Sequence, residues 1–263
     1  MNIIFVLICS PVVAAAVIIP ANVDGIVDSK KLTKEDVRED LYHKILASPN
    51  LQWSVAVINA RVIDEINILQ ATLLAMQRAC AAVVNMKKEN NQKSTSSLPP
   101  HIEESYTICG STDTDGNPIC FEQEILKDCS KLVDTYDKSK LNSDIENRID
   151  RFYALVDGNS LPPNMPVDGA ESIVKGDGKE YCIAAASIIA KVTRDNIMVK
   201  HYDKLYPEYD LKKHKGYPTS AHVEAIYKHN KISPIHRRSY APLKKMIFDA
   251  EGGILGKKEN EKK

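Results

Sequence analysis

The chain has 263 residues, which is enough for one large domain or two modest ones. Its 43% hydrophobic and 27% charged residues are typical of an ordinary globular protein and exclude a collagen, a coiled coil or a fully disordered chain. The net charge of zero is unevenly spread, because residues 89–150 carry a net −7 and residues 171–263 a net +7. The basic C-terminal third could form a phosphate-binding face, although charge alone fits a solvated surface equally well.

The N-terminus and the cysteines bear on localisation. Ile3–Ile8 and Val12–Ile19 are apolar runs that superficially resemble a secretory signal, but no Lys or Arg precedes them and Pro11 interrupts them. We therefore expect two buried strands, with a secreted protein as the alternative. The six cysteines show no CxxC spacing, so we expect reduced thiols in an intracellular protein, cytoplasmic unless an organelle holds it.

The first 86 residues predict alternating strands and helices. Pro11–Ile19 is rich in β-branched residues and predicts an interior strand buried on both faces. Thr33 is expected to cap a helix that runs to Leu46, and Ser54–Ile58 predicts a second strand. Asp64 is expected to open a long amphipathic helix with apolar residues at three- and four-residue spacing.

Residues 87–150 differ in character, since they are acidic, polar and poor in core residues. We interpret them as a largely disordered insertion with a helix near Glu122–Tyr136; a separate cysteine-bearing module is the alternative. We expect order to return at 151–250, with strands at Phe152–Val156 and Ile173–Val174 and helices at Tyr181–Val199 and Ser220–His229. A frayed lysine-rich tail is expected at 251–263. This alternation predicts an α/β fold with a central sheet.

Two aspartates stand out as candidates for chemistry. Asp157 follows an apolar strand and precedes Gly-Asn, and ligand sites of open α/β folds gather at such strand ends, although an Asx turn explains the residue equally well. Asp177 lies in Lys-Gly-Asp-Gly-Lys ahead of a buried helix, which suits a metal ligand or a helix-entry turn. Meeting at one edge, the two carboxylates could bind Mg²⁺ or Mn²⁺.

Eight segments, in order over residues 10–86 and 151–243, resemble those of the ribonuclease HII family. They are Ser-Pro-Val-Val-Ala-Ala-Ala-Val-Ile-Ile-Pro, Asp-Ser-Lys-Lys-Leu, Asn-Ile-Leu-Gln-Ala-Thr-Leu-Leu-Ala-Met, Val-Asp-Gly-Asn, Val-Lys-Gly-Asp, Ala-Ala-Ala-Ser-Ile-Ile-Ala-Lys-Val-Thr-Arg-Asp, His-Lys-Gly-Tyr and Ile-His-Arg-Arg-Ser. The resemblance implies a ribonuclease H-like fold with a central mixed sheet flanked by helices and a helical C-terminal portion from near His201.

The resemblance also implies an activity. Family members use four carboxylates and two divalent ions, Mn²⁺ or Mg²⁺, to cut RNA in RNA–DNA hybrids, including single ribonucleotides embedded in duplex DNA. Asp157 and Asp177 match the third and fourth carboxylates, whereas Asp195, deep in its helix, is expected to be structural. Tyr217 matches the tyrosine that stacks on the sugar at the RNA–DNA junction. The expected phosphate contacts are Ser29, Lys30, Lys31, Lys215, Arg237 and Arg238.

One family motif departs from the pattern. The family's Asp-Glu-Ala-Gly-Arg-Gly, counted back from Pro11, falls on Met1–Val6, which supply no carboxylate and no glycine–arginine loop. Either an upstream exon or start carries the motif, or the chain is an inactive relative that still binds duplexes. We expect weak or no cleavage by this polypeptide, which is otherwise expected to be a monomer with no membrane association.

Overall fold

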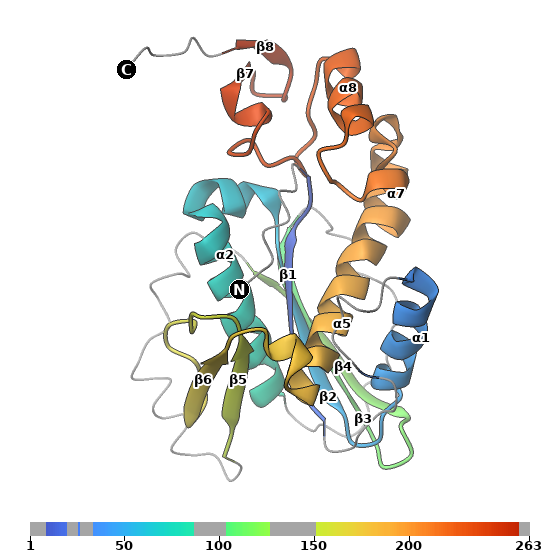
Figure 1. Cartoon of the computed structure of the whole chain (residues 1–263), viewed down its shortest axis with the longest axis vertical. Helices are drawn as coiled ribbons and strands as arrows, with labels where there is room; N and C mark the ends of the chain where they lie inside the picture. Colours follow the sequence, from blue (N-terminus) through green and yellow to red (C-terminus); the bar gives the residue numbers. More distant parts are fainter. Residues whose placement is uncertain (1–8, 20–25, 27–33, 87–103, 127–150, 258–263) are drawn as a thin grey trace.

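The computed structural model describes residues 9–19, 26, 34–86, 104–126 and 151–257. Strands and helices alternate over most of this range, which confirms the predicted α/β class (Figure 1). Ser29, Lys30, Lys31 and Thr33 lie outside the described residues.

The main sheet has four antiparallel strands in the order β1-β2-β3-β4. They are β1 (Val12–Ile18), β2 (Gln52–Ile58), β3 (Ser105–Thr112) and β4 (Pro118–Leu126). Ala14 pairs with Ala56, which in turn pairs with Thr107, so the two small alanines face each other midway along the β1–β2 pair. Strand β2 lies between β1 and β3, and its last five residues are fully buried.

The predicted disorder of residues 87–150 is wrong for residues 104–126, which form the β3–β4 hairpin. The helix expected near Glu122–Tyr136 is a strand as far as Leu126, and the rest of it lies outside the described residues. The polar Asp-Thr-Asp-Gly-Asn segment is the hairpin turn. Asp113 Oδ1 accepts hydrogen bonds from the backbone N–H groups of Asp115 and Asn117, both at 2.8 Å. The polar residues of this turn have the composition of a disordered segment, because a tight turn needs short side chains that form hydrogen bonds with the backbone.

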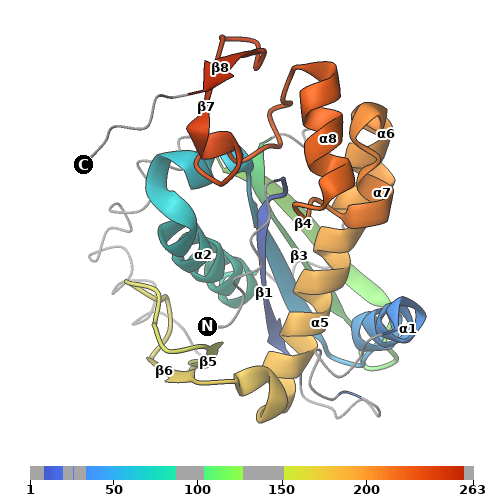
Figure 2. The same cartoon turned by 45° about the horizontal axis from the view of Figure 1, so that its top comes forward.

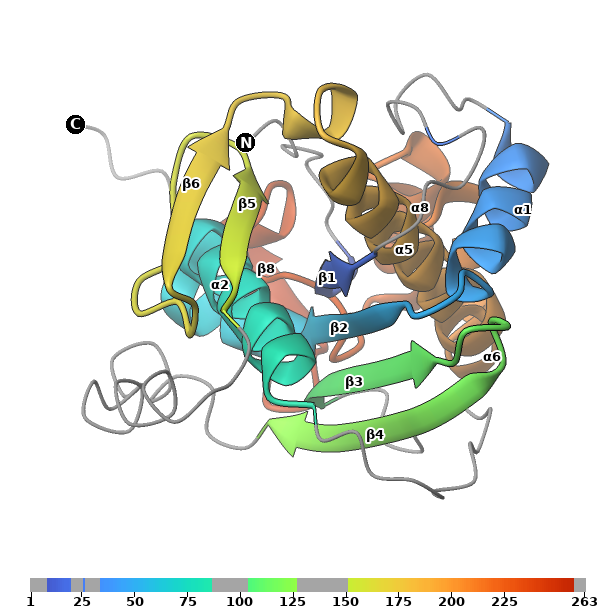
Figure 3. The same cartoon turned by 90° about the horizontal axis from the view of Figure 1, so that it is seen from below.

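Helices cover both faces of the sheet (Figure 3). Helix α2 (Ala60–Val84) contacts β1 and β2 on one face, and α5 (Tyr181–Asn196) contacts β1 on the other, with α1 (Glu35–Leu46) packed against α5. Buried isoleucines of α5 and valines of β2 share one core, and the alanines of α2 line a second. Small residues at the sheet–helix contact let the two layers approach closely.

Helix α2 begins four residues earlier than predicted, because Asn59 Oδ1 accepts from Val62 N at 3.0 Å and caps it. Asn67 then interrupts the helix with a φ of 68°, and its side chain caps the second segment through Leu69 N and Gln70 N. By length and apolar composition alone α2 could cross a membrane, but half of its most apolar stretch is buried in the protein. That burial is typical of a core helix.

A parallel pair, β5 (Tyr153–Asp157) with β6 (Gly169–Ile173), forms a sheet of its own rather than joining the main one. The strands expected to make one mixed sheet are thus divided between an antiparallel sheet and this pair. The β5–β6 connection is held on α2 instead, since the buried Gln77 donates to Pro163 O at 2.9 Å and Asn164 O at 3.3 Å. Within the described residues β1 pairs only with β2, and six of its seven residues are partly exposed, contrary to the predicted interior strand.

The C-terminal portion is mainly helical, as predicted, and stands above the sheet at the end of α5 (Figures 1 and 2). Helix α5 ends at Asn196 and continues as a π-helical segment, η2 (Ile197–Tyr202), earlier than the predicted Val199. The following helices are α6 (Asp203–Leu205), η3 (Pro207–Tyr209), α7 (Leu211–His214), α8 (Ser220–His229) and η4 (Leu243–Lys245). The predicted frayed tail over 251–263 is wrong for its first residues, because β7 (Met246–Phe248) pairs with β8 (Ile254–Lys257); residues 258–263 lie outside the described part of the chain.

Candidate active site

Asp157 is the last residue of β5, as the sequence predicted, and its side chain points to the turn that follows β6. Its Oδ1 atom accepts a hydrogen bond from Gly176 N at 2.7 Å. The strand before it is only partly buried, because β5 belongs to the two-stranded sheet. Asp157 therefore bridges the ends of two parallel strands, and its second oxygen is left for another ligand or for solvent.

Asp177 follows Gly176 in η1 (Gly176–Gly178), a short 3₁₀ turn between β6 and α5, and is only 3% exposed. Lys175 enters this turn in the left-handed conformation with a φ of 57°. A Cβ at Gly176 would lie 2.6 Å from Ile183 Cδ1 and 3.4 Å from Asp157 Oδ1, so a larger residue would require Ile183 to move. The two predicted carboxylates therefore lie at one corner, joined through the Gly176 peptide.

This corner has the donor chemistry of a hard divalent cation. Carboxylate oxygens are the ligands that Mg²⁺ and Mn²⁺ prefer. Asp157 and Asp177 are the residues that would hold such an ion, and the glycines on either side of Asp177 leave the backbone uncrowded. The pair fits one ion better than two, since two-ion sites need more negative charge than two carboxylates bring.

Tyr217 lies in the loop between α7 and α8 and is half-buried, with the Arg194 guanidinium 5.6 Å from its ring centre. Its backbone N–H donates to His214 O at 2.9 Å, which closes the turn after α7. The cation–π contact with Arg194 orders the Tyr217 ring and leaves part of that ring accessible.

Lys215 belongs to an ion-pair network rather than to an open surface. Its Nζ atom lies 2.6 Å from Glu35 Oε1 and 3.3 Å from Asp195 Oδ2, and its side chain is 17% exposed. Arg194 donates both to Asp195 Oδ1 at 2.9 Å and to the Lys215 carbonyl. Burial acts to raise the pKa of Asp195, but the surrounding lysine and arginine charges outweigh it and lower that pKa. The structural role expected of Asp195 fits this network.

The structure does not bring Tyr217 to the aspartate corner. Asp177 precedes the first turn of α5, whereas Arg194 and Tyr217 lie at its other end (Figure 1). A helix of 16 residues is about 24 Å long at 1.5 Å per residue. The predicted site is therefore divided into a carboxylate corner and a separate tyrosine–lysine cluster.

Arg237 is buried, contrary to its predicted phosphate contact. It is 2% exposed, and its Nε atom donates to Ser10 O at 2.9 Å while Nη2 lies 3.4 Å from Ser10 Oγ and from Pro11 O. Burial lowers the pKa of Arg237 to about 10. Its donors satisfy the backbone just before β1, so the guanidinium holds the C-terminal portion to the sheet and faces no solvent.

Arg238 is exposed and remains available for a phosphate, with its guanidinium 5.4 Å from the Phe248 ring centre. Its backbone N–H donates to Asp64 Oδ2 at 2.7 Å, and Ser239 N donates to Asp64 Oδ1 at 2.9 Å. Asp64 thus fixes the Arg-Arg-Ser loop to α2. Sequence reasoning missed this role, because Asp64 and Arg238 are 174 positions apart and nothing local links them.

Comparisons with known proteins place the chain, by its sequence, in a class of nucleic-acid hydrolases. The family model for ribonuclease HII matches residues 126–243, which include both aspartates, Tyr217 and both arginines. Ribonuclease HII of Marinomonas sp. (strain MWYL1) is 38% identical over 238 residues, covering 90% of this chain and 85% of the relative. Those of Aliivibrio fischeri (strain MJ11) and Francisella tularensis subsp. mediasiatica (strain FSC147) are both 37% identical and also cover 90% of this chain, with 81% and 90% of the relatives covered.

The chain therefore belongs to the ribonuclease HII family, a family of endoribonucleases that depend on divalent metal ions. Among solved structures, the ribonuclease H2 of Pyrococcus horikoshii OT3 aligns over 89% of this chain and 96% of its own, at 17% identity and a TM-score of 0.31.

The contrast between the neighbouring arginines gives a testable prediction. We expect Arg237→Ala to lower the free energy of unfolding by about 3 kcal/mol, because it leaves buried carbonyl groups without donors. Arg238→Ala is the matched control, since it keeps the backbone bond to Asp64 and removes only an exposed side chain. It should change stability by no more than about 0.5 kcal/mol. Urea unfolding of both variants measures the difference; equal losses would contradict the assignment of Arg237 as structural.

Proposed function

We propose that the chain carries a ribonuclease HII site that hydrolyses the RNA strand of RNA–DNA hybrids and cuts at single ribonucleotides in duplex DNA. The observation that supports it best is the corner formed by Asp157 and Asp177, where two family-matching carboxylates meet through the Gly176 peptide. Relatives named ribonuclease HII that match 90% of the chain support the same activity.

Mg²⁺ or Mn²⁺ is the proposed cofactor. Asp157 and Asp177 would hold an ion, which when bound would neutralise charge on the scissile phosphate and activate a water. Asp157 is already oriented by the Gly176 N–H, and the near-complete burial of Asp177 restricts its rotation. Both carboxylates are therefore preorganised toward a ligand at low conformational cost.

The second ion of the family's proposed two-ion mechanism needs more carboxylates. Met1 and Asn2 occupy the positions that match the family's first Asp and Glu, so the 263-residue polypeptide brings about half of the family's charge to the site. Since ion affinity falls with ligand charge, we propose that this polypeptide cuts weakly or not at all.

A second candidate is a non-catalytic protein that binds hybrids or ribonucleotide-containing duplexes. It is favoured by the separation of Tyr217 and Lys215 from the carboxylate corner, along most of the length of α5. Tyr217 and the exposed Arg238 could contact a duplex without any ion at the corner. We further propose a cytoplasmic monomer without membrane association. Its catalytic-type domain would comprise residues 1–86 and 151–250 together with the β3–β4 hairpin, which lies within the acidic segment of 87–150 and pairs with β2.

An assay of the 263-residue chain on a labelled duplex with one ribonucleotide separates the candidates. With Mn²⁺ we expect traces of cutting on the 5′ side of the ribonucleotide, leaving a 3′-hydroxyl and a 5′-phosphate, and none with the Asp157→Asn, Asp177→Asn double variant. The affinity of the chain for the duplex should fall as the salt concentration rises. Arg238→Ala should reduce the slope of log affinity against log salt by an amount that corresponds to about one phosphate contact.

If the unaltered chain cut no more than the double variant but still bound the duplex, the result would support the second candidate. Robust cutting by the unaltered polypeptide would contradict the proposed weakness of its site. Failure to bind hybrid at low salt would contradict both candidates.

A further inference from the structure

Three buried side chains with metal-ligating atoms meet where β1 begins and the C-terminal helices dock. Cys9 and His222 are fully buried and His236 is 2% exposed. One ligand atom from each lies within 4.8 Å of the other two. The three residues come from distant parts of the chain and have no role in the proposed cleavage. His236 belongs to the Ile-His-Arg-Arg-Ser segment, but nothing in the sequence links it to Cys9 or His222.

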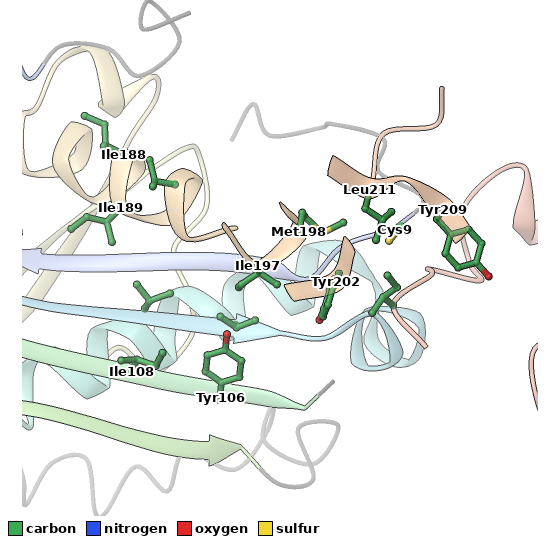
Figure 4. Packing of buried hydrophobic residues seen from close by; sticks show 14 of the residues in the cluster. Cys9, Tyr106, Ile108, Ile188, Ile189, Ile197, Met198, Tyr202, Tyr209 and Leu211 are labelled. Carbon is green, nitrogen blue, oxygen red and sulfur yellow. The ribbon is translucent and has the colours of Figure 1, made fainter. Parts of the chain in front are cut away.

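The fold holds all three in place. Cys9 N donates to Gly216 O at 3.3 Å, and Cys9 forms an isolated antiparallel bridge with His236. Gly216 has a φ of 83°, and any side chain there would overlap the Cys9 carbonyl group. Figure 4 shows Cys9 beside Leu211, Met198 and Tyr209, which belong with it to the buried core.

The two imidazoles present nitrogen to one another. His222 Nε2 lies 3.2 Å from His236 Nε2, while His222 Nδ1 donates to Tyr217 O at 3.0 Å. That outer bond fixes the proton on Nδ1 and turns the Nε2 lone pair toward His236. His236 Nδ1 accepts a hydrogen bond from Ser233 N at 3.1 Å and also lies 3.0 Å from Ser233 Oγ and 3.3 Å from Ser233 O. Without a metal the His236 proton is therefore on Nε2, facing His222. Binding of an ion through Nε2 would move that proton to Nδ1, where Ser233 O or Oγ can accept it.

These outer hydrogen bonds are those that orient metal-binding histidines. Burial lowers the pKa of both imidazoles, which disfavours their charged form, and raises the pKa of the Cys9 thiol to about 12, so the ion itself has to displace the thiol proton. His214 stacks on His222, but its ring nitrogens are engaged by Tyr209 O and Gly216 N, at 2.7 and 3.2 Å. The ligand set is therefore one sulfur and two nitrogens.

We propose that Cys9, His222 and His236 form a structural binding site for Zn²⁺. Tetrahedral zinc with bonds of about 2.0–2.1 Å to nitrogen places two imidazole nitrogens about 3.3 Å apart, close to the 3.2 Å found here. A zinc–sulfur bond replaces the Cys9 S–H bond, and the proton leaves to solvent. The three residues supply three of the four ligands of tetrahedral zinc, and a water taken up with the ion would have to complete the fourth position.

The ion would tie the segment before β1 to α8 and the loop after it. His222 lies in the first turn of α8, where its N–H donates to the Thr219 hydroxyl at 3.3 Å. His236 precedes Arg237, which already anchors Ser10. Zinc would therefore strengthen an existing contact between the sheet and the C-terminal portion, and binding energy of this kind adds to folding energy.

The test uses the tag-free, metal-stripped full chain titrated with ZnCl₂ in excess Mg²⁺, so that the carboxylate corner does not bind the added zinc. We expect one Zn²⁺ per chain by elemental analysis after gel filtration, and a rise in Tm of about 5 °C at 100-fold the Kd. Cys9→Ala should lower Zn²⁺ affinity at least about 100-fold. Cys80→Ala, which removes another buried thiol, should leave it unchanged.

Co²⁺ gives a second readout that does not depend on stability or cleavage. The wild-type chain and Cys80→Ala should show a sulfur-to-cobalt charge-transfer band, and Cys9→Ala should not. No retained zinc and no band in the wild-type chain would overturn the proposal, leaving His222 and His236 as a hydrogen-bonded pair. Equal zinc binding by Cys9→Ala would also overturn it.

Discussion

Replacing Met1–Val6 by Asp-Glu-Ala-Gly-Arg-Gly, after an added initiator Met, is expected to raise Mn²⁺-dependent cutting of a single-ribonucleotide duplex at least about 100-fold. The replacement supplies the two carboxylates and the glycine–arginine loop that the family motif carries and that these positions lack. Added negative charge would raise ion affinity at a site that otherwise has Asp157 and Asp177. Initial cutting rates of the two polypeptides under identical conditions measure the gain.

The matched control is a replacement by Asn-Gln-Ala-Gly-Arg-Gly, which has nearly the same shape and no carboxylate. It should cut no faster than the unaltered chain. A gain as large with the amide version would mean that the loop rather than the carboxylates limits cutting. No gain with either version would contradict the proposal that charge at these positions limits activity.

Asp177→Asn in the chain carrying the acidic motif should remove most of the gained activity, by at least about 100-fold. Asn keeps the size of the side chain in the tight turn between Gly176 and Gly178, and it removes the negative charge that an ion requires. Because Asp177 is 3% exposed, solvent cannot replace the lost carboxylate. Single-turnover cutting with Mn²⁺ in excess separates this loss from weaker substrate binding.

Asp168→Asn is the matched control for this variant. Asp168 lies on the same β5–β6 unit, accepts from Phe152 N at 2.8 Å, and faces Arg151 rather than the corner. It should cut like its parent. If both variants lost activity equally, the loss would reflect damage to the β5–β6 unit and not removal of a ligand.

Helices and short strands with strong local signals were predictable. Helix α8 has its predicted bounds because Thr219 caps it and Asn230, in the left-handed conformation, ends it. The α/β alternation and the Asp157 strand end were also readable from the chain. Residues 104–126 were misread because a hairpin turn and a disordered segment use the same polar residues, and only pairing with β2 distinguishes them.

Long-range contacts decided the rest. Arg237 and Arg238 are neighbours in sequence, yet one is buried against Ser10 and the other is exposed, and charge patterning cannot tell them apart. Asp64 and the cluster of Cys9, His222 and His236 depend on segments that meet only in the folded chain. Asp157 and Asp177 could be predicted from the sequence as candidate ligands. Their separation from Tyr217 by the length of α5 could not.

A Mn²⁺ titration followed by electron paramagnetic resonance tests whether Asp157 and Asp177 together form a divalent-ion site. We expect bound Mn²⁺ in the unaltered chain and in Asp168→Asn, and its loss in the Asp157→Asn, Asp177→Asn double variant. Equal Mn²⁺ binding by the double variant, or none by the unaltered chain at millimolar Mn²⁺, would contradict the claim.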